Sequence, residues 1–223
     1  MLRAMLWTIL AVIVFNLGGF MIGGLLLHRA YHIRKRDQAA EWKHQPKKFQ
    51  SRRQMFEKLP LVILNGVIIN VAIGIALHLS FTGQTSAYLN PADHSILLAI
   101  ATPILSGVWY HFALYYWHRT LHHPKLYRHI HHMHHKYKAP MFLDALYEHP
   151  IEAAYGGFVI AAPLLFAPAW IPGWLIFLGI VGIHEVLDHA GADINIPLLS
   201  KAWEHDEHHR RFHNGYGQLL TIL

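Results

Sequence analysis

The feature that most constrains this chain is a series of long stretches without a charged residue. Residues 4–27, 59–79 and 95–117 contain no Asp, Glu, Lys or Arg. A helix of about 20 apolar residues crosses a bilayer, so these stretches predict about three transmembrane helices. For the first stretch a cleaved signal peptide is the alternative, because Arg3 precedes it. We favour a membrane anchor, because the stretch exceeds the apolar core of a signal peptide and no clear small-residue cleavage site follows.

A fourth uncharged stretch covers residues 153–183 and has a different character. As one helix it would be about 46 Å long, too long for a single upright span. Two full spans would need about 40 residues, more than it contains. Pro163, Pro168 and Pro172 interrupt it, and proline breaks helices. We therefore expect a re-entrant hairpin of two short helices.

The basic residues are concentrated in one segment. Residues 28–58 hold ten Lys and Arg against three Asp and Glu, a net charge of +7, whereas the rest of the chain has a net charge of −1. Because basic loops beside membrane spans face the cytoplasm, we expect this loop and residues 118–152 and 184–223 on the cytoplasmic side. A basic loop between apolar segments indicates a membrane flank and not a nucleic-acid interface.

Together these patterns predict an all-α integral membrane protein. About three transmembrane helices and the re-entrant hairpin would support a helical cap in the cytosol. We expect residues 1–94 to form a membrane-anchor hairpin with the basic cytoplasmic loop. Residues 95–223 would form the rest of what is one structural domain overall.

Histidine is strongly clustered. The chain has 21 histidines, and sixteen of them lie within residues 111–213. Three motifs hold most of these, WHRTLHH, HIHHMHHK and EHDEHHRRFH. Side chains three or four residues apart share one face of a helix. That spacing groups His118 with His122, and it recurs twice as i, i+3, i+4, in His131, His134, His135 and in His205, His208, His209.

Such faces of imidazoles are typical of metal sites. Because the chain has no cysteine, thiolate zinc sites and iron–sulfur clusters are excluded. Eight clustered histidines exceed the ligands of one ion, so two ions fit better, and a closed zinc site with four ligands would leave several idle. Iron suits imidazole and keeps open positions for dioxygen. Nearby residues could add ligands or orient the imidazole rings: His149, His184, Glu148, Asp188, Glu204 and Asp206.

The motifs resemble those of the fatty acid hydroxylase/sterol desaturase superfamily of membrane di-iron oxygenases. The similarity covers about residues 110–217 and is greatest to the C4-methylsterol oxidase branch. It rests on YYWHRTLHHPKLYRHIHHMHHKYKAP, LYEHPIE, DHAGADINIP and HDEHHRRFHNGYG, which occur in the order of that family. The resemblance implies two non-haem iron ions held by the nine histidines His118, His122, His131, His134, His135, His189, His205, His208 and His209.

The resemblance also implies an activity. Members of the superfamily use dioxygen to hydroxylate, desaturate or otherwise oxidise a C–H bond of a lipid of the sterol or fatty-acyl type. They take electrons from a separate reductase chain that uses NAD(P)H. The membrane would be the endoplasmic reticulum in a eukaryote or the inner membrane in a bacterium. No catalytic residue beyond the metal ligands is indicated.

Two other classes of protein remain open from the residues alone. A histidine-rich metal-binding or transport protein could use the same side chains, although transporters place such ligands at the bilayer midplane. A haem electron-transfer protein could use His78 and His111, inside two spans, as axial ligands.

Overall fold

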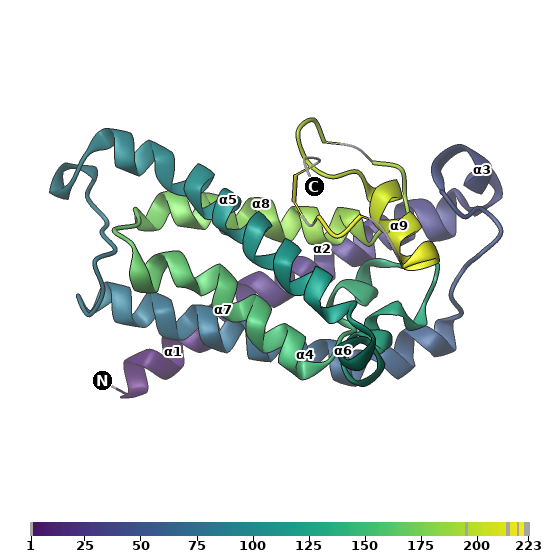
Figure 1. The fold of residues 1–223 in the computed structure, drawn as a ribbon, viewed down its shortest axis with the longest axis horizontal. Helices are drawn as coiled ribbons and strands as arrows, with labels where there is room; N and C mark the ends of the chain where they lie inside the picture. Colours follow the sequence, from purple (N-terminus) through teal and green to yellow (C-terminus); the bar gives the residue numbers. More distant parts are fainter. Residues whose placement is uncertain (1, 195, 213–214, 218, 221–223) are drawn as a thin grey trace.

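The structure is a computed structural model that describes residues 2–194, 196–212, 215–217 and 219–220. Within these ranges the regular secondary structure is helical, apart from isolated β-bridges. The helices form an elongated bundle, and short helices and loops gather at one end of it (Figure 1). The prediction of an all-α fold is confirmed.

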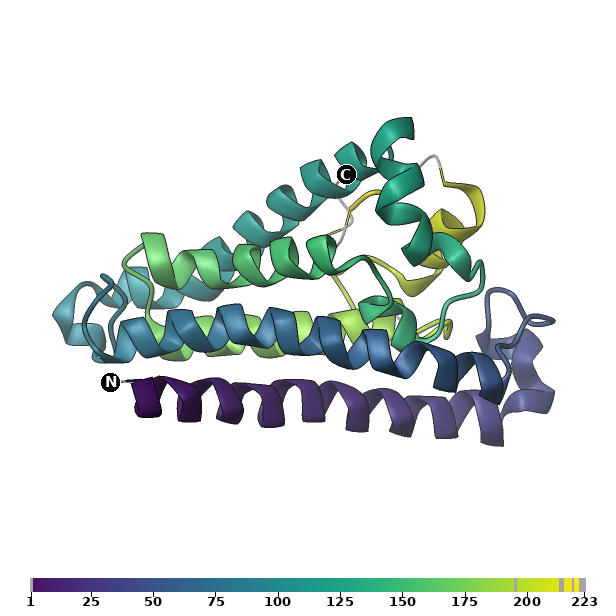
Figure 2. The same cartoon turned by 90° about the horizontal axis from the view of Figure 1, so that it is seen from below.

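One long helical rod forms the N-terminal part of the chain. It runs along the whole bundle beside α4 (Arg52–Phe81) (Figure 2). Two π-helical turns interrupt its α-helical hydrogen bonding, and such turns often mark functional positions. Its four consecutive elements are α1 (Leu2–Val12), η1 (Ile13–Leu17), α2 (Gly18–His28) and η2 (Arg29–Arg34).

The helix α4 lies at the centre of the bundle and packs against both α1 and α7 (Pro150–Phe166). Glycine permits both close contacts, since a side chain there would collide with the neighbouring backbone. A Cβ on Gly74 would lie 2.7 Å from Ile9 Cα, and one on Gly157 would lie 2.9 Å from Ile69 Cα. Small residues allow membrane helices to approach in this way.

The fourth apolar stretch forms two helices, α7 and α8 (Ile171–Asp188), joined at residues 167–170. Of the three prolines, Pro163 lies inside α7, Pro168 lies in the connection and Pro172 in the first turn of α8, where proline is favoured. Trp174 donates a hydrogen bond to the carbonyl of Ile160 across the pair. The break is therefore as expected, whereas the re-entrant depth stays a prediction.

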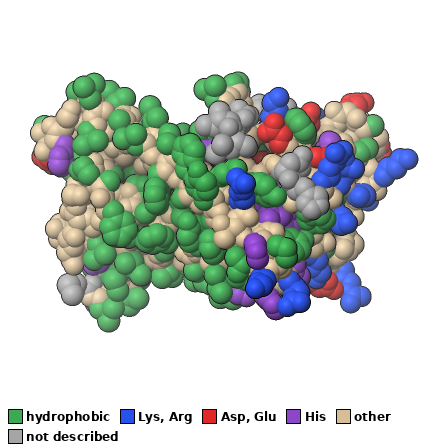
Figure 3. All heavy atoms as spheres, in the orientation of Figure 1, with side chains coloured by type: hydrophobic (Ala, Val, Ile, Leu, Met, Phe, Trp, Pro, Cys, Tyr) green, Lys and Arg blue, Asp and Glu red, His purple; other side chains and the backbone are tan. Residues whose placement is uncertain are grey.

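Four helices are long and apolar enough to cross a membrane among the described residues: Leu2–Arg34, Arg52–Phe81, Ile96–Leu121 and Ile171–Asp188. We expected about three, and α8 is the additional candidate, with 18 residues. On the face seen in Figure 3, hydrophobic side chains predominate along the long helices, and Lys and Arg gather at the end where the short helices lie. The chain is an integral membrane protein.

The remaining elements form the cap at the charged end of the bundle. The helix α5 (Ile96–Leu121) enters the cap from the membrane region, and α8 ends in it. The short elements of the described chain are η3 (Arg36–Gln38), α3 (Ala39–Trp42), η4 (Pro91–Asp93), α6 (Pro124–His129), η5 (His131–Lys136), η6 (Phe142–Leu146) and α9 (Ala202–Arg211). All but η4, which precedes α5 at the far end, belong to the cap or to the basic segment beside it.

Candidate metal centre

The cap brings nine histidines together in two adjoining groups, as found in the described part of the chain. The first group consists of His118, His122, His131, His135 and His208, and the second of His134, His189, His205 and His209. Within each group one nitrogen of every ring lies within 4.8 Å of the others. Eight of the nine residues are buried, and His122 is half-buried. These are the nine histidines that the sequence analysis selected.

The rings in each group point their nitrogens at a common centre. His135 Nε2 lies 3.2 Å from His122 Nε2, and 3.1 Å from the Nε2 atoms of His131 and His208. A ring nitrogen carries one proton or one lone pair, so three such contacts are not three hydrogen bonds. Two imidazole nitrogens about 2.1 Å from one ion and at right angles lie about 3.0 Å apart. The arrangement therefore fits lone pairs that converge on a cation.

The second group repeats this arrangement. His205 Nε2 lies 2.9 Å from His189 Nε2 and 3.0 Å from His209 Nε2. The ring centroids of His134 and His209 are 4.6 Å apart. The two groups are in direct contact, because the ring centroids of His135 and His209 lie 4.8 Å apart. Two neighbouring metal ions fit this donor set.

Each HxxHH motif contributes to both groups. His131 and His135 of the second motif belong to the first group, whereas His134 belongs to the second. His205 and His209 of the third motif belong to the second group, whereas His208 belongs to the first. The sequence predicted the shared face but not this division. The second motif forms the 3₁₀ helix η5, in which His132 is exposed.

Several rings are held in orientation by hydrogen bonds from Nδ1, the ring nitrogen that faces away from the centre of the group. His131 Nδ1 donates to Glu152 Oε2 over 2.6 Å, and both side chains are buried. His118 Nδ1 donates to the carbonyl of Tyr216, and His189 Nδ1 donates to the carbonyl of Glu185, each over 3.2 Å. These bonds leave Nε2 unprotonated toward the centre, as a metal requires. Sequence reasoning missed Glu152 and Glu185, although Glu152 ends the motif LYEHPIE, three residues after His149, and Glu185 lies four residues before His189.

Burial favours the neutral form of several histidines of the two groups. It lowers the pKa of His189 to about 3, and it lowers the pKa values of His134, His205 and His209 well below the ordinary range. Repulsion by neighbouring rings, were they charged, adds to the effect at the last three. Neutral imidazole is the form that binds metal.

The six additional candidates lie around the two groups and in neither of them. His149 caps α7, and its Nδ1 accepts a hydrogen bond from Ile151 N. His184 bonds to Ser200. Asp188 Oδ2 lies 3.4 Å from His205 Nδ1 and can orient that ring.

The other three candidates have different surroundings. Asp206 accepts from Gln45 Nε2 over 2.5 Å, so it ties the basic segment to the cap. Glu204 accepts from Lys201 N and caps α9. Glu148 lines a chamber beside the histidines. Burial, together with the charges of Glu152 and Glu185, raises the pKa of the Glu148 carboxyl. His213, the last residue of the third motif, lies outside the described residues.

The two residues considered as haem ligands are also outside both groups. His111 Nδ1 accepts a hydrogen bond from Leu220 N, which ties the C-terminal segment to α5. His78 is buried within α4.

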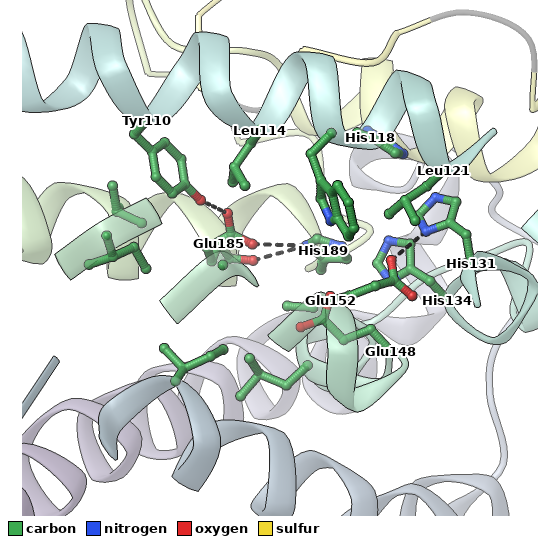
Figure 4. A pocket seen from close by; sticks show the side chains of 17 residues that line it. Tyr110, Leu114, His118, Leu121, His131, His134, Glu148, Glu152, Glu185 and His189 are labelled. Carbon is green, nitrogen blue, oxygen red and sulfur yellow. Dashed lines mark hydrogen bonds and ion pairs between the residues drawn. The ribbon is translucent and has the colours of Figure 1, made fainter. Parts of the chain in front are cut away.

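A chamber of about 120 Å³ lies beside the histidines (Figure 4). Tyr110, Leu114, His118 and Leu121 reach into it from α5, and Glu185 comes from α8. Apolar side chains dominate the membrane-side wall, which includes Ile69, Ile160 and Val181. Tyr110 Oη donates to Glu185 Oε1 over 2.7 Å. The chamber therefore offers a mostly apolar space directly beside the imidazole rings of the two groups.

The basic segment has a structural role that its charge did not predict. Lys58 forms a fully buried ion pair with Asp144 in η6. Gln50 Nε2 donates to the same carboxylate over 2.6 Å. Together with the bond from Gln45 to Asp206, these contacts fasten residues 45–58 to the segments that carry the second and third histidine motifs.

Comparison with known proteins agrees with this geometry. The model of the family "Fatty acid hydroxylase" matches residues 103–223, more than half of the chain. The fatty acid hydroxylase ahd1 of Mycosarcoma maydis is 32% identical over 184 residues, which cover 80% of this chain and 46% of that protein. Fatty acid hydroxylase domain-containing protein 2 of Homo sapiens is 36% identical over 135 residues, 59% of this chain and 38% of the relative.

Methylsterol monooxygenase 1 of Rattus norvegicus is 32% identical over 126 residues, 53% of this chain and 41% of the relative. The chain thus spans about half the length, or less, of these curated relatives. No solved structure matches it significantly. The family match confirms the resemblance found in the histidine motifs, and the relatives include both fatty acid hydroxylases and methylsterol monooxygenases. The chain therefore belongs to the fatty acid hydroxylase family.

Proposed function

We propose that this protein is a non-haem di-iron monooxygenase that hydroxylates, or otherwise oxidises, a C–H bond of a membrane lipid. One observation carries the proposal. Nine histidines from α5, η5, the end of α8 and α9 converge in two adjoining groups beside an apolar chamber. Transport of metal ions would not need such a chamber.

The two histidine groups would each hold one ferrous ion. Bound iron would supply the reduction of dioxygen and the oxidation of the C–H bond. The chain's own residues provide the ligands and their orientation. Glu152 and the carbonyls of Tyr216 and Glu185 hold the rings of His131, His118 and His189 with Nε2 toward the centre.

The chamber would bind the substrate and exclude water. Its walls are mostly apolar, so a hydrocarbon group can displace solvent from it at little cost. The substrate would be of the fatty-acyl or sterol type, by analogy with the names of the relatives. Electrons would come from a separate NAD(P)H-dependent donor protein.

We also propose an arrangement in the membrane. Residues 1–94 would anchor the protein, and residues 95–223 would carry the di-iron site within one structural domain. The basic segment would place the cap on the cytoplasmic side, because Lys and Arg are retained there. The pair α7–α8 would form the re-entrant hairpin. Both ends of this pair reach the cap, where Glu152 bonds to His131 and His189 joins the second group.

Metal analysis of the detergent-purified protein tests the proposal. We expect about two iron ions per chain, together with dioxygen consumption that depends on added electrons. The variant His134→Ala should lose iron and turnover. His132→Ala is the matched control, since His132 lies two residues away but is exposed. Full iron content and full turnover in His134→Ala would overturn the assignment of that ligand.

A further inference from the structure

A second apolar hollow lies on the flank of the bundle, between the N-terminal rod and α8. It is a groove of about 550 Å³. Phe15, Gly19 and Gly23 line one wall, and Gly179 and Ile183 the other. Phe15 is 81% exposed and Ile183 60% exposed, so the groove opens to the surroundings of the bundle. In an integral membrane protein those surroundings at mid-helix are lipid chains.

A small hollow of about 70 Å³, which we call the neck, adjoins the groove on its inner side. Neck and groove share the lining residues Asn16, Phe20, Leu178 and Gly182. Neck and histidine chamber share Ile69, Leu146, Ile160, Val181 and Glu185. The three hollows therefore adjoin one another in series, from the lipid-facing flank to the imidazoles.

We propose that the alkyl chain of a bilayer lipid reaches the histidine centre sideways, through this groove and past Gly182. The proposal rests on the proposed function and specifies the route by which its substrate arrives. The small size of the neck determines which kind of lipid group can pass through it. A neck that holds only a few water-sized groups admits an unbranched row of CH₂ groups one after another, whereas a fused-ring nucleus would have to pass as a whole.

The neck has one polar feature, at the π-helical turn of the N-terminal rod. Asn16 lies in η1, and its Nδ2 donates to Asn70 Oδ1 over 2.8 Å. Polar side chains inside membrane segments are costly and usually functional. Asn16 Oδ1 faces Gly182, at 3.8 Å from the position that a Cβ there would take. Asn16 and Gly182 are therefore neighbours where the groove meets the neck.

Glycine at position 182 keeps the passage open. Among the described residues its Cβ position has no neighbour within 4 Å except Asn16 Oδ1, so a larger side chain would enter empty space and not the core. The variant Gly182→Leu should plug the neck without displacing α8. Gly18→Leu is the matched control on the rod, because its Cβ position also has no neighbour within 4 Å. Gly18 does not line the groove, the neck or the chamber.

Photo-crosslinking follows the path directly. The iron-loaded protein is placed in phosphatidylcholine nanodiscs that contain palmitic acid with a diazirine at the chain end, and labelled residues are mapped by mass spectrometry. In the wild type and in Gly18→Leu we expect labels in the groove at Phe15 and in the chamber at Ile69 and Ile160. In Gly182→Leu the chamber labels should fall by roughly tenfold while the groove labels stay, because the chain stops at the neck.

A separate apolar hollow provides an internal control. It has a volume of about 370 Å³, lies between α5 and α7, and includes Leu105 and Phe166. It shares no lining residue with the chamber, so its labelling should be equal in all variants. Iron content and gel filtration verify that Gly182→Leu is folded. If that variant does not fold, labelling of the wild type still tests the proposal, because a chamber without label would contradict it.

Three results would overturn the proposed path. One is a wild-type chamber without label, and another is equal chamber labelling in Gly182→Leu. The third is an unlabelled groove in a protein that light scattering shows to be a dimer, because a second copy would then cover the groove. The failure of the proposed function would look different: a protein without iron or turnover, whatever the labelling.

Discussion

Replacement of Glu152 tests how strongly the surroundings of the histidines support the metal centre. The Glu152 carboxylate has two tasks. Its Oε2 accepts from His131 Nδ1 over 2.6 Å, and its Oε1 accepts from His149 N over 3.2 Å at the start of α7. Loss of a carboxylate that orients a metal-binding histidine costs about 10- to 100-fold in metal affinity. Loss of a helix cap costs about 1 kcal/mol of stability.

We therefore expect Glu152→Ala to weaken iron binding by about 10- to 100-fold and to lower stability by about 1 kcal/mol. Glu152→Gln keeps an acceptor of similar size and should lie between this variant and the wild type. The assay is competition with a chelator of known iron affinity, together with thermal unfolding of the iron-free protein. Glu204→Ala is the matched control, because Glu204 caps α9 in the same position and makes no hydrogen bond to a histidine among the described residues.

Stability and iron affinity, measured separately, distinguish the loss of a carboxylate that orients His131 from a general loss of fold. Glu204→Ala should lose stability alone, whereas Glu152→Ala should lose both stability and iron affinity. Iron affinity within about twofold of the wild type in Glu152→Ala would refute the role of this carboxylate.

Two further predictions concern stability. Asp144→Asn leaves the buried Lys58 ammonium without its charge partner and should cost about 3–5 kcal/mol. Glu57→Gln, which breaks the exposed pair with Arg53 on the same helix, should cost less than about 1 kcal/mol in the same thermal unfolding assay. Equal losses would contradict the burial argument. Acid should also destabilise the iron-free protein. Burial lowers the pKa of His189 to about 3, so between about pH 6.5 and pH 3 this residue binds a proton in the unfolded chain but not in the folded chain, and the free energy of unfolding falls as the pH falls. An unfolding midpoint that rises as the pH falls through this window would refute it.

The basic segment shows how a correct inference from composition can be incomplete. Its charge predicts a loop beside the membrane, and charge alone says nothing about which residues become buried. Lys58 is fully buried against Asp144, and Gln45 bonds to Asp206. The partners lie 86 and 161 residues further along the chain, beyond the reach of any local pattern.

Local periodicity explains what could be read in advance. Uncharged stretches identified α1–α2, α4 and α5, because a helix in lipid must be apolar over its whole length. The spacing of three and four residues selected eight of the nine histidines in the two groups, because that spacing defines one face of a helix, whereas His189 came from the resemblance to the family.

Long-range packing decided the rest. Only the convergence of α5, η5, α8 and α9 divides the histidines into two groups, and it sends His134 and His208 to the group opposite their motif neighbours. Packing between distant segments also brings Glu152 of α7 to His131 across 21 residues, and it lines the neck with residues of the N-terminal rod, α4, η6, α7 and α8. Sequence spacing fixes which side chains share a face, whereas the distance between faces depends on how helices far apart in the chain pack against each other.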